Sequence, residues 1–97
     1  MSGSQPQRMS TQQGLHVATI AHSGQLWDAY LQLDDDPRQP QIYRGRLRFN
    51  RAGAEGPQTV AQTTVIIIEE SYEEAVAKAR SFDDRQLEAL LRSSLKG

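Results

Sequence analysis

The chain contains no cysteine, and this absence removes several kinds of chemistry at once. Disulfides, thiolate metal sites and cysteine nucleophiles are all excluded. Aromatic residues are also scarce, at 6% of the 97 residues. No apolar run approaches the roughly 20 residues that a transmembrane helix needs, and the N-terminus lacks the hydrophobic segment of a signal peptide. We therefore expect a cytoplasmic protein that does not enter a membrane.

The chain also lacks an excess of charge of either sign, because its 11 basic and 12 acidic residues give a formal net charge of −1. Such a chain has no overall basic field that would draw nucleic acid. Hydrophobic residues make up 37% and charged residues 24%, as in a globular protein, and the length suits one modest core. We predict a disordered tail over residues 1–13, which are mainly Ser, Gln, Gly and Pro, and a single α+β domain over residues 14–97.

The strongest structural feature is the run Val65–Ile68, four consecutive β-branched residues. Branching at Cβ favours an extended backbone, and a run without alternation favours burial on both faces. We predict a core strand over Val60–Glu69. Ser71 and Glu74 then have the spacing of a capping box, which predicts a helix that begins near Tyr72.

Two earlier segments, 15–21 and 26–33, predict a β-hairpin. Gly24 supplies the positive φ that a two-residue Ser-Gly turn requires. In that register Ile20 lies opposite Trp27, and a slip of one residue would move apolar side chains to the wrong face. The predicted core face carries Ala18, Ile20, Trp27, Ala29, Leu31 and Leu33.

The segment 42–50 alternates in the same way. One predicted face carries Arg44, Arg46 and Arg48. The opposite face carries Tyr43, Gly45, Leu47 and Phe49. This alternation predicts a third strand with one apolar face and one basic face.

A second helix is expected after Ser81 or Asp83, either of which is a good N-cap. Leucines recur along it at helical spacing, which is typical of a core stripe or of a dimer seam. The element order is therefore ββββαα. We predict an α+β fold in which a four-stranded antiparallel meander carries two C-terminal helices packed on one face.

The sheet face without helices would leave apolar side chains uncovered, including Val17 and Tyr30. Exposed apolar patches of this kind usually mark an interface. We therefore predict a homodimer in which sheets or helices are in contact, which also suits a chain this small. The predicted interface residues are Val17, Tyr30, Leu87, Leu91 and Leu95.

The pattern Arg44-x-Arg46-x-Arg48 is the most informative functional feature. Residues two apart on a strand point the same way and lie roughly 7 Å apart, close to the spacing of successive phosphates in a nucleic acid. Single-stranded DNA or RNA is one predicted partner. The alternative is a solvent-facing strand whose arginines pair with acids such as Asp28. The predicted contact residues are Arg44, Arg46, Arg48, Arg51, Tyr30 and Tyr43.

The predicted ββββα order is similar to the building block of the Pur-alpha and Whirly single-stranded DNA binders. The similarity is one of topology, and no sequence motif carries residues across. It implies a dimeric fold that binds single-stranded nucleic acid.

Motifs of catalysis are missing: there is no nucleophile elbow, phosphate-cradling glycine loop or paired His and carboxylate signature. His16 and His22 share a face of one predicted strand but stand about 20 Å apart, too far to share a metal ion. We expect no cofactor, no metal and no enzymatic activity. The alternative function to nucleic-acid binding is a protein-interaction or assembly module that acts as a homodimer.

Overall fold

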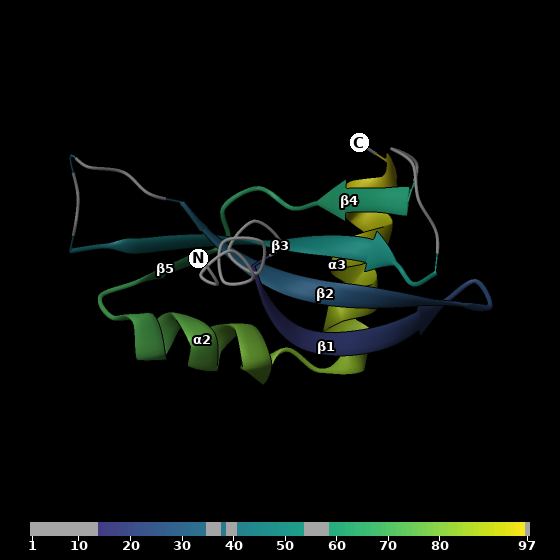
Figure 1. Ribbon diagram of the computed structural model, residues 1–97, viewed down its shortest axis with the longest axis horizontal. Coiled ribbons are helices and arrows are strands. Elements are labelled where there is room, and N and C mark those ends of the chain that lie inside the picture. The colour runs from purple at the N-terminus through teal and green to yellow at the C-terminus, as the bar shows by residue number, and fades with distance from the viewer. Residues whose placement is uncertain (1–13, 35–37, 39–40, 54–58, 97) are drawn as a thin grey trace, which may run out of the picture.

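The computed structural model describes residues 14–34, 38, 41–53 and 59–96 (Figure 1). They form an antiparallel sheet followed by two helices, which confirms the predicted α+β fold and its ββββαα order. The predicted tail at 1–13 lies outside the described residues. The elements are β1 (Leu15–His22), β2 (Gln25–Asp34), β3 (Tyr43–Arg51), β4 (Val60–Gln62), β5 (Ile67–Glu69), α2 (Tyr72–Ser81) and α3 (Asp84–Lys96).

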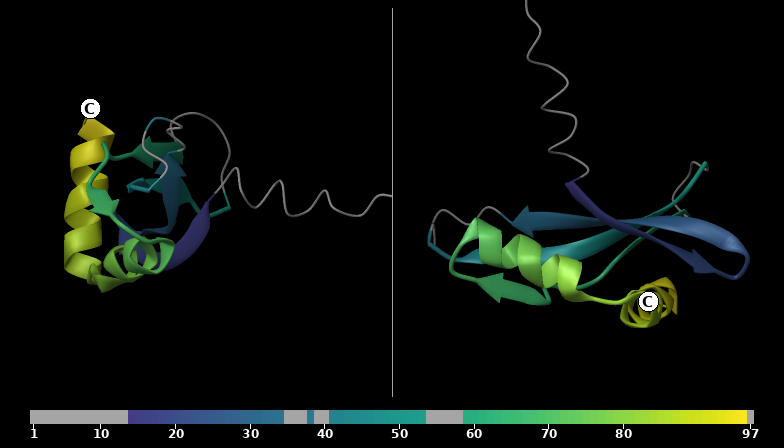
Figure 2. Two further views of the ribbon diagram at one scale, coloured as in Figure 1. Left: turned by 90° about the vertical axis from the view of Figure 1, so that its left-hand side faces the viewer. Right: turned by 90° about the horizontal axis from the view of Figure 1, so that it is seen from below.

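The strands lie in the order β1-β2-β3-β4, and β5 also pairs with β3. Both helices lie on one side of the sheet, where α3 runs across the strands and α2 lies beside β5 (Figures 1 and 2). We call this side the core face. No described helix or strand covers the opposite side, which we call the outer face. None of the described helices is long and apolar enough to cross a membrane.

The β1–β2 hairpin turns at Ser23 and Gly24, as predicted. Their φ angles are 53° and 76°, so both central residues are left-handed, as a type I′ turn requires. The turn fixes the register, and Ile20 lies opposite Trp27. Both side chains are buried in the core.

The register of β1 changes further from the turn, where the prediction was wrong. A bulge between His16 and Ala18 places His16 opposite Tyr30, so its side chain lies on the outer face. Val17 is the additional residue, and it packs against the core together with Ala18. The predicted exposure of Val17 is therefore incorrect, because a bulge changes which residues face the core.

The alternation of β3 is confirmed. Gly45, Leu47 and Phe49 are buried on the core face, whereas the arginines between them are half-buried on the outer face. A Cβ at Gly45 would lie 2.8 Å from Leu31 Cδ1, so a larger residue there would displace the end of that side chain. The buried core comprises Ile20, Trp27, Ala29, Leu31, Leu47, Phe49, Ala61, Ile67, Ala75, Ala79, Leu87 and Leu91.

The predicted strand Val60–Glu69 is divided into β4 and β5 by residues 63–66. At this interruption the Thr63 side chain replaces a backbone acceptor in the hydrogen bonding to β3. Its hydroxyl accepts a hydrogen bond from the Leu47 N–H at 3.0 Å and donates one to the Thr64 carbonyl at 2.6 Å. The side chain thus satisfies a backbone group that a regular strand would have paired with a carbonyl.

The interruption adds two residues to this side of the ladder. Phe49 pairs with Ala61, but Gly45 pairs with Ile67 instead of with the residue that an uninterrupted ladder would place there. An even insertion preserves the alternation of side chains, so Ile67 is 1% exposed on the core face and Ile68 is 57% exposed.

Both helices begin at side-chain caps. The Ser71 hydroxyl accepts a hydrogen bond from the Glu74 N–H at 3.1 Å, as predicted. At α3, the Asp83 carboxylate accepts from the Gln86 N–H at 2.8 Å, and the Gln86 side chain accepts from the Asp83 N–H at 2.9 Å. Asp83 is therefore the N-cap of a separate second helix.

The leucine stripe of α3 belongs to the core of the chain. Leu87 and Leu91 are 1% and 0% exposed against the sheet. Their predicted role as interface residues is incorrect, because their side chains are already buried within one chain. Leu95, one turn further, remains 41% exposed.

Candidate functional site

The outer face is organised as rows of side chains that cross the strands. One row contains His16, Tyr30, Arg48 and Gln62, one residue from each of β1 to β4. Directly opposite residues on neighbouring strands lie close enough for their side chains to interact. Further rows pair Gln32 with Arg46, and place Arg44 between Asp34 and Ile68.

Tyr30 and His16 form an aromatic contact in the first row. Their ring centroids are 5.4 Å apart and the rings are nearly perpendicular, at 71°. His16 Nε2 also lies 3.1 Å from Asp28 Oδ1. The Thr19 hydroxyl donates a 2.6 Å hydrogen bond to the same oxygen. His16 thus links the Tyr30 ring to the Asp28 carboxylate on the outer face.

The three arginines that β3 places on the outer face differ in their partners. Arg46 donates to both carboxylate oxygens of Asp34, at 2.9 and 3.3 Å, so its charge is largely compensated. Among the described residues, no acid lies within ion-pair distance of Arg44 or Arg48. Of the three arginines on the described part of the outer face, Arg44 and Arg48 are therefore the two without an acidic partner.

The predicted contact residues do not all lie together. Tyr30, Arg44, Arg46 and Arg48 share the outer face. Tyr43 packs against the core cluster, since its position in β3 has the parity of the core face. Arg51 has the same parity and lies opposite Trp27 at the end of the strand. The geometry therefore supports four of the six predicted contacts as a single surface.

Several polar residues of the outer face were missed from the sequence. The Gln62 side-chain amide donates to Gln32 Oε1 at 3.2 Å, reaching across β3. Thr19 lies opposite Asp28 in the same register that pairs Ile20 with Trp27, so their contact follows from the predicted turn. The contribution of His16 was not, because it depends on the bulge.

The cluster of His16, Asp28 and Thr19 does not have the geometry of a catalytic triad. One nitrogen of His16, Nε2, lies 3.1 Å from both Asp28 Oδ1 and the Thr19 hydroxyl, and that hydroxyl donates to the same carboxylate oxygen. The acid and the hydroxyl therefore do not contact opposite nitrogens of the imidazole, as a chain from acid to base to nucleophile requires. The side chains of His16 and Asp28 are 50% and 29% exposed. In the part of the chain that the structure describes, no three His, Asp or Glu side chains are placed to hold a metal ion.

His22 lies away from this cluster, and the prediction that it shares a face with His16 is wrong. Its Nδ1 is 3.1 Å from Glu88 Oε2 of α3, so it lies on the helix side of the sheet. The bulge at Val17 changes the face of His16 but not that of His22. The two imidazoles therefore contact different parts of the molecule.

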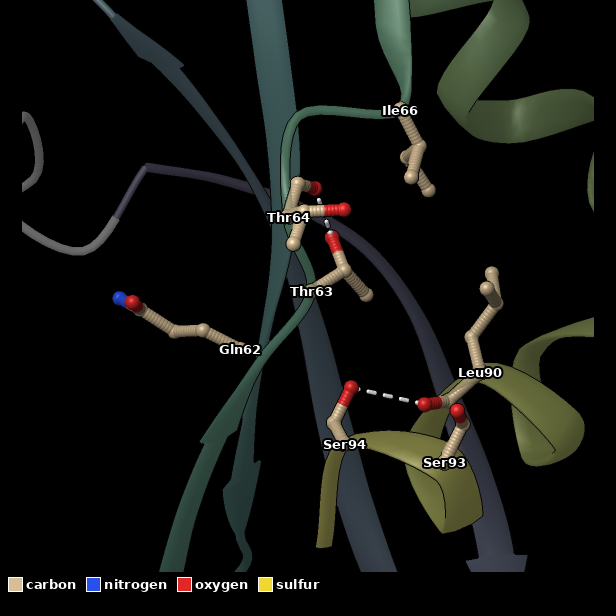
Figure 3. Close-up of a pocket in the computed structure, with 7 residues that line it drawn as sticks. All are labelled: Gln62, Thr63, Thr64, Ile66, Leu90, Ser93 and Ser94. Carbon is tan, nitrogen blue, oxygen red and sulfur yellow. Dashed lines mark hydrogen bonds between the residues drawn. The ribbon is translucent and has the colours of Figure 1, made fainter. Parts of the chain in front are cut away.

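A pocket of about 310 Å³ lies between the β4–β5 interruption and α3 (Figure 3). Thr63 and Thr64 form one wall, and the Ser94 hydroxyl on the other wall donates to the Leu90 carbonyl at 2.8 Å. The lining residues are Gln62, Thr63, Thr64, Ile66, Leu90, Ser93 and Ser94. None of them is acidic, basic or histidine, so the pocket lacks a group for proton transfer.

Comparisons of the chain with protein-family models, with curated proteins and with solved structures found no match.

Proposed function

We propose that the outer face binds single-stranded nucleic acid. The observation that carries this proposal is the position of Arg44, Arg46 and Arg48 on one sheet face that no described element covers. Tyr30 lies directly opposite Arg48 on the neighbouring strand. Proteins that bind single strands without sequence specificity combine cationic side chains, which contact the phosphate backbone, with aromatic rings on which the bases stack.

Phosphate contacts are assigned to Arg44 and Arg48. Both lack an acidic partner among the described residues, whereas Arg46 is held by Asp34. Four residues along a strand span about 13 Å, so the two guanidinium groups can contact phosphates separated along an extended strand. Their forked donors suit phosphate oxygens.

Tyr30 is assigned the stacking role. Its ring is half-buried at the centre of the row and is held from one side by His16. A ring that is already oriented loses little conformational entropy when a base stacks on it. Stacking of this kind contributes roughly 1–3 kcal/mol per base.

Acidic residues on the outer face limit the affinity for nucleic acid that we expect. Asp28 and Asp34 lie beside the arginines, and the net charge of the chain is −1. Binding should therefore be modest in affinity and should weaken steeply as salt rises, since counterion release is its main driving force.

The test of the phosphate contacts is Arg48→Gln, with Arg85→Gln as the control. Arg85 is exposed on α3, on the other side of the molecule, and loses the same charge. In anisotropy titrations of a labelled oligothymidylate, Arg48→Gln should weaken binding roughly fourfold near physiological salt and reduce the salt slope by about 0.7. Equal binding by both variants would contradict the proposal.

The test of stacking is Tyr30→Leu, with Tyr72→Leu as the control. Tyr72 is an exposed tyrosine at the start of α2. Tyr30→Leu should weaken binding roughly tenfold without changing the salt slope, because stacking releases no counterions. A changed slope with unchanged affinity would assign Tyr30 a different role.

A further inference from the structure

A base that stacks on Tyr30 points its far edge toward β1, a placement that rests on the proposed function. The phosphates contact Arg44 and Arg48 on β3, and Tyr30 lies on the neighbouring strand β2. The next strand is β1, which lies two strand spacings, about 10 Å, from β3. A nucleotide carries its phosphate and the Watson–Crick edge of its base at opposite ends. This edge therefore lies near His16, the residue opposite Tyr30 on β1.

An acid lies on the outer face at this place. Asp28 is two residues from Tyr30 along β2, on the same face, and its side chain is 29% exposed. In the described part of the chain, no arginine or lysine lies within ion-pair distance of Asp28, whereas Asp34, further along β2, is paired with Arg46. An uncompensated carboxylate repels phosphate, but it accepts hydrogen bonds from the donor groups of a base.

The hydrogen bonds of Asp28 leave one of its two oxygens for a base. The Thr19 hydroxyl donates its one proton to Oδ1 at 2.6 Å, and His16 Nε2 lies 3.1 Å from the same oxygen. Since Nε2 also lies 3.1 Å from the Thr19 oxygen, it faces two acceptors, and we assign the imidazole proton to Nε2. These contacts orient the carboxylate through Oδ1. Among the described residues, no hydrogen bond or ion pair involves Oδ2.

We propose that Asp28 gives the outer face a preference for guanine. Its Oδ2 accepts hydrogen bonds from the N1–H and the 2-amino group of a guanine that stacks on Tyr30. Guanine is the base whose Watson–Crick edge carries two adjacent donors. Adenine and cytosine have an acceptor nitrogen beside their amino group, and thymine has a carbonyl oxygen on each side of its N3–H. Each of these three bases therefore presents an acceptor to the carboxylate.

This preference adds to the phosphate and stacking contacts and does not replace them. Arg44 and Arg48 contact the backbone of any sequence, so oligothymidylate still binds. Hydrogen bonds to an ionised acceptor are stronger than those between neutral groups. A guanine on Tyr30 should therefore bind roughly tenfold more tightly than an adenine there. A failure of the preference and a failure of nucleic-acid binding are distinguishable, because the first changes a ratio of affinities and the second removes them all.

The direct test compares three purines with the wild-type protein. Labelled thymine-rich oligonucleotides of one length carry guanine, hypoxanthine or adenine at the same positions, and anisotropy titrations give their affinities. The stacking surfaces are similar, but hypoxanthine lacks the 2-amino donor and adenine also replaces N1–H by an acceptor. Guanine should bind roughly tenfold more tightly than adenine, with hypoxanthine between them. Equal affinities would overturn the preference alone, whereas no binding of any oligonucleotide would overturn the proposed function and the preference with it.

The second test is Asp28→Asn, with Asp34→Asn as the control. Both variants remove one negative charge from the outer face of β2, so both should strengthen binding of oligothymidylate. Asparagine at position 28 keeps an oxygen for Thr19 and replaces Oδ2 by a donor, so the guanine-to-adenine affinity ratio should fall to roughly one or less. Asp34→Asn should keep the wild-type ratio, because Asp34 contacts Arg46. A guanine preference that persists in Asp28→Asn would overturn the proposal.

Discussion

The two faces of the sheet differ in what their side chains do, although they are built from the same strands. On the core face, Leu47 and Phe49 are fully buried under the helices. On the outer face, the neighbouring Arg48 has no acidic partner among the described residues. Adjacent residues of β3 therefore serve opposite purposes: one holds the helices, and the next is available to a ligand.

This difference predicts that folding and binding are separable by mutation. Burial of apolar area dominates the free energy of folding, and most of it lies on the core face. Charges and hydrogen bonds at an exposed surface contribute little to stability. Substitutions on the core face should therefore change the free energy of unfolding, whereas those on the outer face should change affinity.

The largest effect is expected from aspartate at the leucines of α3. Leu91→Asp places an uncompensated charge at a position that is 0% exposed and should destabilise the fold by more than about 4 kcal/mol. Leu95→Asp, one turn away and 41% exposed, should cost about 1 kcal/mol or less. Circular dichroism during urea unfolding measures both. Similar losses would mean that α3 is not held by the core face.

The next comparison uses neighbours on β3. Leu47→Ala should cost about 2–5 kcal/mol because it leaves a cavity, while Arg48→Ala should cost about 1 kcal/mol or less. Thermal unfolding gives the stability of each variant, and oligonucleotide titration gives its affinity. Only Arg48→Ala should weaken binding while the fold persists. Loss of stability in both variants would remove the distinction between the faces.

A smaller effect is expected where the ladder is interrupted. Thr63→Val keeps the shape of the side chain but leaves the Leu47 N–H without its acceptor, which should cost about 1–3 kcal/mol. Thr64→Val, at an exposed position, should cost about 0.5 kcal/mol or less. Chemical unfolding of the two variants compares them. A neutral Thr63→Val would show that another group satisfies this amide.

The smallest effect concerns the ion pair on the outer face. Arg46 and Asp34 have side chains that are 31% and 38% exposed, so a double-mutant cycle with alanine should give a coupling of roughly 0.2–1 kcal/mol. Asp34→Ala should also strengthen oligonucleotide binding, because it releases Arg46. Weaker binding by Asp34→Ala would show that the carboxylate positions the arginine instead of competing for it.

Features set by local sequence could be predicted. The Ser23-Gly24 turn fixes the hairpin register near it, and the alternation of β3 separates arginines from core residues. The cap at Ser71 marks the start of α2. These features depend on neighbouring residues, so the sequence contains their cause.

Features that depend on packing could not be predicted. The bulge at Val17 adds one residue to β1 without a glycine or proline to mark it. The interruption at 63–66 adds two residues, and an even insertion leaves the apolar pattern unchanged. Leu87 and Leu91 have the spacing of both a core stripe and a dimer seam, and only their burial distinguishes these. The outer-face cluster at His16 could not be predicted either, because the bulge at Val17 is what places His16 on the outer face.

The most direct test of the central claim is the affinity of the wild-type protein for a labelled single-stranded oligonucleotide at two salt concentrations. If Arg44 and Arg48 contact phosphates, raising salt from about 50 mM to about 200 mM should weaken binding by roughly sevenfold. Fluorescence anisotropy measures both affinities. No binding at the lower salt concentration, where electrostatic contacts are strongest, would contradict the assignment of the outer face to nucleic acid.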